Sequence, residues 1–162
     1  PMKKIILALL GISLIASVLP TSCSDDDDTY TPSSSVVEVF YDYYPDASNV
    51  RWYYVYGYLV ADFDYNDTDM EAWFSGVGTW LYTKIDISYE ELPAEIQNSL
   101  NINYPYYDID DVLEINTSKY GTFYNVDIDN DNEYLSLLYD EDGVLINIYA
   151  NVLPYTWWDT LD

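Results

Sequence analysis

The fold is decided by a stretch of the chain whose side chains alternate, Tyr58-Leu59-Val60-Ala61-Asp62-Phe63-Asp64. In an extended strand, successive side chains point to opposite faces. Leu59, Ala61 and Phe63 therefore share one face, and the two carboxylates lie on the other. The same period of two returns at residues 123–129. Both stretches are predicted to be half-buried strands of an antiparallel sheet.

Turn-forming residues divide the chain into further strands. Asn, Asp and Gly, which tolerate positive φ, gather at residues 65–68, 75–78, 129–132 and 140–143. These clusters indicate a meander of neighbouring antiparallel strands. The sequence predicts eight of them, at residues 49–56, 58–64, 69–75, 79–86, 109–116, 121–128, 133–139 and 144–151.

A helix is predicted before each group of four strands. Apolar residues recur at intervals of three and four in residues 36–44 and 96–104, which is the spacing of one helical face. Pro45 and Pro105 end these patterns, because proline lacks the N–H that a continuing helix needs.

The start of the second helix carries additional signals. Ser88 and Glu91 have the spacing of a capping box, and Pro93 suits a first-turn position. We therefore place this helix near residues 92–103.

The chain also matches itself. Residues 40–45 align with residues 100–105 at an offset of 60, and residues 70–81 align with 135–146 at an offset of 65. Insertions in turns account for the drift. The predicted fold class is α+β, a tandem repeat of two units, each a helix plus a four-stranded antiparallel sheet. The units are placed at residues 35–88 and 89–152, followed by a tail at residues 153–162.

The first residues have the features of a secretory signal. Two lysines precede the fifteen apolar residues Ile5–Leu19, a run shorter than the roughly 20 residues that span a bilayer. Residues 1–22 are predicted to be a signal peptide. Cys23 follows a small residue and resembles the lipidated cysteine of a bacterial lipoprotein box, which implies a membrane anchor through lipid. Cleavage by the ordinary signal peptidase, leaving a free thiol, is the alternative.

Residues 23–34 are predicted to be a solvated tether. Asp25–Asp28 are followed by a Pro, Ser and Thr stretch without apolar periodicity. The acidic run is a charged spacer or, because Cys-Ser-Asp-Asp-Asp-Asp resembles the surface-export signal of Bacteroidetes lipoproteins, a sorting signal. The resemblance implies an outer-membrane lipoprotein exposed at the cell surface, with a periplasm-facing protein as the alternative.

Composition excludes several classes of function. The 162 residues include 29 acidic and 5 basic side chains, a formal charge of −24, so nucleic acid would be repelled. There is no His and one Cys, which removes His-based triads, His metal sites and disulfide frameworks. Paired carboxylates are uninformative among 29 acids. We therefore expect no enzyme activity and no cofactor.

One acidic run has the alternating oxygen ligands that suit Ca²⁺. Residues 127–133 have the sequence Asp-Ile-Asp-Asn-Asp-Asn-Glu, and residues 62–71 show a weaker form of the same pattern. An EF-hand loop beginning at Asp127 requires Gly at position 132 and Glu at position 138, where the chain has Asn132 and Leu138. An acidic hairpin turn is the prediction that remains.

A family resemblance rests on six short sequence motifs that occur in a fixed order. These are Val50-Arg51-Trp52, Ala61-Asp62-Phe63, Glu71-Ala72-Trp73-Phe74, Gly78-Thr79-Trp80, Leu92-Pro93 and Tyr104-Pro105. In this respect residues 35–150 resemble the PepSY-like lipoproteins of Bacteroidetes. The resemblance implies a fold like that of the β-lactamase inhibitor protein, whose concave sheet grips an enzyme. No motif of inhibition itself is matched, and the chain lacks that protein's disulfides.

The candidate binding face is the side of the sheet opposite Leu59, Ala61 and Phe63. Alternation is expected to gather aromatic rings beside carboxylates there, namely Trp52, Tyr54, Tyr56, Tyr58, Trp73, Trp80 and Tyr82 with Asp62, Asp64 and Glu71. Such rings are typical of interface hot spots and also stack on sugars. The alternative is that several of them, Trp73 and Trp80 above all, are ordinary core.

The function that best fits the sequence is a non-catalytic binding module. Without residues 1–22, three cationic side chains oppose 29 acids, a charge of −26, which would steer in a protein partner with a basic surface. A glycan-binding accessory protein is the alternative, and fold analogy adds an inhibitor of a secreted hydrolase. An open row of coplanar rings would favour sugar, whereas a concave aromatic and acidic sheet would favour protein.

Overall fold

An open antiparallel sheet organises the part of the chain that the computed structural model describes, residues 29–154, 157 and 161. Its eight strands are hydrogen-bonded in chain order, each to the next. Their bounds are β1 Ser48–Val55, β2 Tyr58–Tyr65, β3 Thr68–Phe74, β4 Trp80–Asp86, β5 Asp108–Thr117, β6 Gly121–Asp129, β7 Tyr134–Asp140 and β8 Leu145–Tyr149. The predicted meander is confirmed, and no predicted strand end is wrong by more than two residues.

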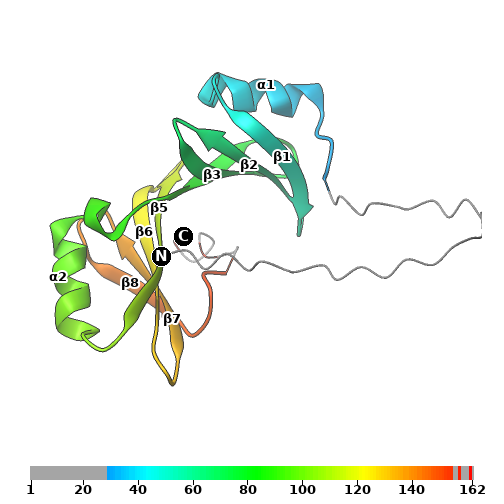
Figure 1. The fold of residues 1–162 in the computed structure, drawn as a ribbon. Coiled ribbons are helices and arrows are strands. Elements are labelled where there is room, and N and C mark those ends of the chain that lie inside the picture. The colour runs from blue at the N-terminus through cyan, green and yellow to red at the C-terminus, as the bar shows by residue number, and fades with distance from the viewer. Residues whose placement is uncertain (1–28, 155–156, 158–160, 162) are drawn as a thin grey trace, which may run out of the picture.

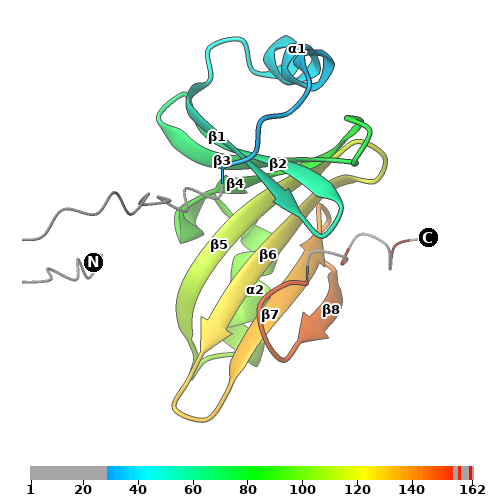
Figure 2. The same cartoon turned by 90° about the vertical axis from the view of Figure 1, so that its right-hand side faces the viewer.

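Two helices cover the outer, convex face of this curved sheet (Figure 1). Helix α1, Ser34–Tyr43, precedes β1–β4, and helix α2, Ala94–Asn103, precedes β5–β8. The sheet continues without a break from one half to the other, because β4 pairs with β5 from Tyr82 opposite Thr117 to Asp86 opposite Leu113. Figure 2 shows α2 behind β5 and β6, whereas the segment after β8 passes in front of the sheet.

Each helix packs its apolar stripe on the sheet half that follows it. Val36 and Phe40 of α1 form one core with the odd-numbered residues of β2 and the even-numbered residues of β3. Ile96 and Leu100 of α2 form the other core with residues that include Val126 and Leu137. The two cores lie on the same face of the sheet, so the opposite, concave face is left for other contacts.

The capping box lies one element earlier than predicted. Ser88 and Glu91 cap a short 3₁₀ helix, η1, Tyr89–Glu91, with the Ser88 N–H and hydroxyl both donating to Glu91 Oε2 at 2.7 and 2.8 Å. Pro93 then follows as the N-cap of α2. Because the proline ring fixes φ near the helical value, Pro93 allows α2 to begin directly after η1.

A glycine in each half lets a turn approach its helix. Gly78 and Gly143 have φ values of 88° and 79°. A Cβ on Gly78 would lie 2.6 Å from Val36 Cγ2, and one on Gly143 would lie 2.6 Å from Glu95 Cβ. Any larger residue would push the β3–β4 or β7–β8 turn off the first turn of its helix.

The predicted signal peptide at residues 1–22, the lipidated Cys23 and the run Asp25–Asp28 lie outside the described residues. Within the predicted tether, the Tyr30 N–H donates to the carbonyl oxygen of Trp52 at 2.6 Å, so this part contacts β1. In the described part of the chain, no helix has the length and apolar character needed to cross a membrane.

Candidate functional site

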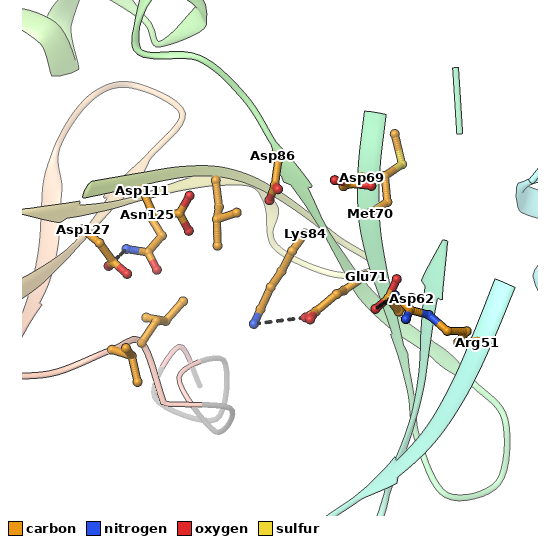
Figure 3. Close-up of a pocket in the computed structure, with 13 residues that line it drawn as sticks. Arg51, Asp62, Asp69, Met70, Glu71, Lys84, Asp86, Asp111, Asn125 and Asp127 are labelled. Carbon is orange, nitrogen blue, oxygen red and sulfur yellow. Dashed lines mark hydrogen bonds and ion pairs between the residues drawn. The ribbon is translucent and has the colours of Figure 1, made fainter. Parts of the chain in front are cut away.

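The concave face of the sheet holds a hollow of about 440 Å³ (Figure 3). We call it the acidic hollow, because six carboxylates and only two cationic side chains line it. The carboxylates come from five neighbouring strands, β2 to β6, and the cations come from β1 and β4. These side chains are Asp62, Asp69, Glu71, Asp86, Asp111 and Asp127, with Arg51 and Lys84.

Lys84 is the central cation of the hollow. Its Nζ lies 3.5 Å from Glu71 Oε2, and its side chain is 20% exposed. The same Nζ is 5.2 Å from the centroid of the Trp73 ring. The indole N–H of Trp73 donates to Glu71 Oε2 at 3.1 Å. Lys84 and the Trp73 indole thus both contact Glu71 Oε2. Glu71 is the carboxylate of the hollow with which Lys84 forms its ion pair.

Arg51 contributes less charge compensation. Its guanidinium donates to Asp62 Oδ2 at 3.1 Å, but the two side chains are 61% and 39% exposed. Exposed pairs of this kind stabilise a fold by at most about 1 kcal/mol. The Arg51–Asp62 pair therefore lies at the rim of the hollow, where a charged group of another molecule can replace either partner.

A buried hydrogen-bond network forms the opposite wall. Asn125 Nδ2 donates to Asp127 Oδ1 at 2.9 Å and to Ser136 Oγ at 2.8 Å. The Tyr134 hydroxyl donates to Asp127 Oδ2 at 2.7 Å. Burial first, and then this bond to a carboxylate, raise the pKa of Tyr134. Asp127, only 8% exposed, is thus a fixed acceptor rather than an adaptable one.

Asp86 and Asp111 are two acids of the hollow whose repulsion by other carboxylates the charge of Lys84 offsets only in part. Partial desolvation first, and the neighbouring carboxylates second, raise the pKa of Asp86; Asp111, Asp69 and Glu71 are those neighbours. Desolvation and the charge of Asp127 likewise raise the pKa of Asp111. Since both side chains still contact solvent, a cation from outside can reach them.

An apolar seam continues the concave face beyond the acids. It consists of six buried side chains contributed by β2 to β7, Val60, Trp73, Tyr82, Ile115, Phe123 and Leu138. The Trp73 and Tyr82 rings stack with centroids 5.5 Å apart and an interplanar angle of 15°. Trp157 packs on this apolar seam, where it is fully buried.

Part of the predicted aromatic face is wrong. Trp52 pairs with Ala61 and Tyr54 with Leu59, so both lie on the convex face. Trp52 is 8% exposed and packs in the α1 core, whereas Tyr54 is 58% exposed. The β1–β2 connection has two residues, Tyr56 and Gly57, both at positive φ. Such a turn places even-numbered residues of β1 beside odd-numbered residues of β2.

Trp80 is also on the convex face, for a different reason. Between β3 and β4 the register shifts, so that Trp73 pairs with Tyr82 but Phe74 pairs with Trp80. The bulge leaves Leu81 without a paired residue in β3 and reverses the alternation. The Trp80 indole N–H donates to Thr83 Oγ1 at 3.0 Å. This bond lies on the face of the sheet that α1 covers.

The other predicted residues share the concave face, with one exception. Tyr58, Asp62, Asp64, Trp73 and Tyr82 alternate onto it as expected. Tyr56 is the exception, because it lies in the β1–β2 turn and is 77% exposed.

At the edge of this face Asp64 lies beside Asp69. The Asn49 amide donates to Asp64 and lowers its pKa, and Asp64 in turn raises the pKa of Asp69. The pair adds to the concentration of negative charge along the rim.

Sequence reasoning missed most of the acidic hollow. Lys84, Asp86 and Asp111 were not singled out, and Asp127 was considered only as a calcium ligand. A signal for Asp127 was present, because Asn125 and Asp127 alternate with buried residues just as the acids of β2 do. For Asp86 and Asp111 no local pattern existed.

The predicted acidic hairpin turn between β6 and β7 is confirmed. Asn130 Oδ1 accepts the N–H groups of Asn132 and Glu133 at 2.9 and 3.0 Å, an Asx turn. Among the residues that the structure describes, no cluster of three or more acidic or Cys side chains is arranged to hold a metal ion.

Comparison with known families gives a clear result for residues 57–147. They match the model of the family described as "Putative beta-lactamase-inhibitor-like, PepSY-like". The chain belongs to the PepSY-like family. A search of curated proteins finds no match to this PepSY-like chain.

Solved structures give the same fold. A DUF2874 family protein from Bacteroides ovatus is 27% identical, with a TM-score of 0.70 over 74% of this chain and 88% of its own. A BLIP-like protein from Bacteroides fragilis is 26% identical, with a TM-score of 0.69 over 77% of this chain and 91% of its own. A protein from Bacteroides eggerthii described as "putative periplasmic" is 22% identical, with a TM-score of 0.69 over 74% and 88%.

Proposed function

We propose that this PepSY-like chain is a non-catalytic binding module of the cell envelope, and that its concave face binds a protein with a basic surface. The observation that carries the proposal is the acidic hollow. Its six carboxylates face two cations, which leaves four negative charges uncompensated. A Lys or Arg side chain of a partner would relieve the repulsion that raises the pKa of Asp86 and Asp111.

The rest of the protein reinforces this attraction over a distance. The chain has 29 acidic and 5 basic side chains, and such a field accelerates the approach of a cationic partner. At the contact itself, Lys84 and Arg51 prevent the hollow from accepting any cation indiscriminately, because each has to be displaced or bridged. Specificity then comes from the shape of the face as well as its charge.

A protein partner is better supported than a glycan. A sugar platform uses exposed coplanar rings, whereas the stacked Trp73 and Tyr82 are 6% and 1% exposed. The exposed rings Tyr30 and Tyr54 are inclined at 32° to one another. The inhibitor-like form of the same function, in which the partner is a secreted hydrolase, is supported by the description of the family.

Charge-matched variants test the proposal. Asp86→Asn with Asp111→Asn removes two charges from the acidic hollow, and Glu38→Gln with Asp42→Asn removes two from the exposed face of α1. Cross-linking on intact cells with mass spectrometry identifies a partner, whose affinity is then measured with purified proteins. The hollow variant should bind at least tenfold more weakly and the α1 variant should bind normally. Equal binding by both variants, or an association rate independent of salt, would rule the hollow out.

The cellular location is part of the proposal. Lys3, Lys4, the apolar run and Cys23 support an outer-membrane lipoprotein, exposed at the surface or facing the periplasm. The description of the Bacteroides eggerthii protein as "putative periplasmic" supports the cell envelope.

We further infer that residues 35–88 and 89–152 are copies of one unit. Both contain a helix followed by four strands. Gly78 and Gly143 approach the first turn of their helices in the same way. Superposition of the two halves in an experimental structure tests this, with the two glycines expected to coincide.

A further inference from the structure

Four exposed side chains, three of them tyrosines, gather at one end of the first half of the sheet. Tyr54 belongs to β1, Tyr56 to the β1–β2 turn and Val77 to the β3–β4 turn. The Tyr30 ring lies against the Tyr54 ring, with centroids 5.5 Å apart. We call this surface, made of Tyr30, Tyr54, Tyr56 and Val77, the uncharged end.

The two turns that contribute to the uncharged end touch each other. A Cβ on Gly76 would lie only 2.9 Å from the carbonyl oxygen of Gly57. These two glycines are the neighbours of Val77 and Tyr56 in the chain. The exposed side chains therefore lie close together, although they come from three separate stretches of the sequence.

The three stretches that form this surface carry no charge. Residues 29–37, 52–61 and 73–83 contain no acidic or basic side chain, although 21% of all residues are charged. The opposite end of the same strands is acidic, because the β2–β3 turn contains Asp67 and is flanked by Asp64 and Asp69. An exposed apolar surface of this kind marks a site of contact with another protein or with a membrane.

The position of the predicted lipid anchor favours the membrane. The Tyr30 N–H donates to the carbonyl oxygen of Trp52, so the described chain begins against β1 (Figure 1). Tyr30 is seven residues after Cys23. An extended chain spans at most about 3.6 Å per residue, so a lipid on Cys23 keeps Tyr30 within about 25 Å of the membrane surface.

The chemistry of the uncharged end also suits a lipid surface. Tyrosine is enriched at membrane–water interfaces, because its ring is apolar and its hydroxyl group is polar. Anionic headgroups would repel the acidic hollow and the β2–β3 turn. Contact through the uncharged end avoids this repulsion.

We propose that the uncharged end docks on the surface of the membrane in which Cys23 is anchored, with its three tyrosine rings among the lipid headgroups. The inference rests on the lipid anchor of the proposed function. It adds an orientation to that anchor, because the docked end determines which parts of the protein face away from the lipid.

This orientation keeps the acidic hollow accessible. In the β1–β2 ladder, the Arg51–Asp62 pair at the rim of the hollow is four residues from the last pair, Val55–Tyr58, or about 13 Å along the strands at 3.3 Å per residue. The Debye length at physiological ionic strength is about 8 Å. The headgroup charges are therefore largely screened at the hollow, which stays open to a basic partner.

Hydroxyl-radical footprinting tests the docking, because it measures the solvent access of individual side chains. The lipidated chain is placed in vesicles of phosphatidylethanolamine and phosphatidylglycerol, and residues 23–162 with Cys23→Ala are the reference without lipid. On vesicles, Tyr54 and Tyr56 should be oxidised at least threefold more slowly than in the reference. Tyr106, an exposed tyrosine after α2, is the control and should be oxidised at the same rate in both samples.

Two results would overturn the docking. One is equal oxidation of Tyr54 and Tyr56 in the two samples, and the other is equal protection of Tyr106. Protection on intact cells but not on protein-free vesicles would also overturn it, because a protein would then cover the uncharged end.

A pair of double variants tests the role of the rings. Tyr54→Ser with Tyr56→Ser leaves Cys23 unchanged but should abolish the protection of Val77. Tyr41→Ser with Tyr106→Ser changes two exposed tyrosines elsewhere and should leave Val77 protected. Protection of Val77 in both variants would show that the rings do not hold the surface on the lipid. If the first variant does not fold, the footprint of the wild type decides.

The lipid anchor is tested separately from the docking. Absence of palmitate labelling of the wild type would overturn the anchor. The Cys23 thiol of residues 23–162 is then coupled to a maleimide phospholipid in the same vesicles. Slower oxidation of Tyr54 and Tyr56 on these vesicles supports the docking and unchanged oxidation overturns it, so failure of the anchor and failure of the docking are distinguishable.

Discussion

Trp52 and Tyr54 make a matched pair of substitutions, because they lie two residues apart on the same face of β1 and differ in burial. Trp52 is 8% exposed and Tyr54 58% exposed. Trp52 meets the Phe40 ring edge-on at 5.4 Å and the Phe74 ring at 5.7 Å between centroids. Replacing it with Ala leaves a cavity under α1 that these rings border.

We expect Trp52→Ala to lower the free energy of unfolding by about 3 to 5 kcal/mol, the usual cost of truncating a large buried aromatic residue. At roughly 3 °C for each kcal/mol in a domain of this size, the melting temperature should fall by about 9 to 15 °C. Tyr54→Ala removes an exposed ring and should cost less than about 1 kcal/mol.

Urea denaturation followed by circular dichroism measures both free energies, and thermal melts give the change in Tm. The slope against urea concentration must stay the same in the two variants for the comparison to hold. A loss below about 1 kcal/mol for Trp52→Ala, or equal losses for the two variants, would refute the β1–β2 register on which the assignment of the faces depends.

Three further predictions concern the charge and the anchor. Cys23→Ala should release the protein from membranes and abolish labelling by palmitate, and a mutant that stays in the membrane fraction after a carbonate wash would contradict lipidation. Replacing Asp25–Asp28 with Ser should keep palmitate labelling but reduce digestion by external protease, and unchanged digestion would identify the run as a spacer. Because the pKa values of Asp86 and Asp111 are raised above the ordinary 3.8, their contribution to stability is fully present below that pH and is lost as pH rises through the folded-state values. Asp86→Asn with Asp111→Asn should therefore be modestly more stable than wild type at pH 7, by urea denaturation, with no such advantage at pH 3.5.

The sequence by itself determined the order and type of the elements. Alternation in residues 58–64 and 123–129, turn residues between strands and prolines after each helix are local signals, because strand and helix periods depend only on neighbouring residues. These signals placed both helices and all eight strands. They also gave the family resemblance, which the match to residues 57–147 confirms.

Only the tertiary structure decided which face each side chain occupies. The two-residue turn at Tyr56 and Gly57 and the bulge at Leu81 each reverse the alternation between strands, and a one-residue change of register moves every side chain to the other face. Trp52, Tyr54 and Trp80 were misplaced for this reason alone.

The acidic hollow and the buried Trp157 also required the folded chain. Asp86, Asp111 and Asp127 stand far apart in the sequence and meet because β4, β5 and β6 pair side by side. Their mutual repulsion, and hence the raised pKa of Asp86 and Asp111, depends on distances through space. Trp157 is buried because the concave curvature of the sheet offers it an apolar seam, a surface that no single strand contains.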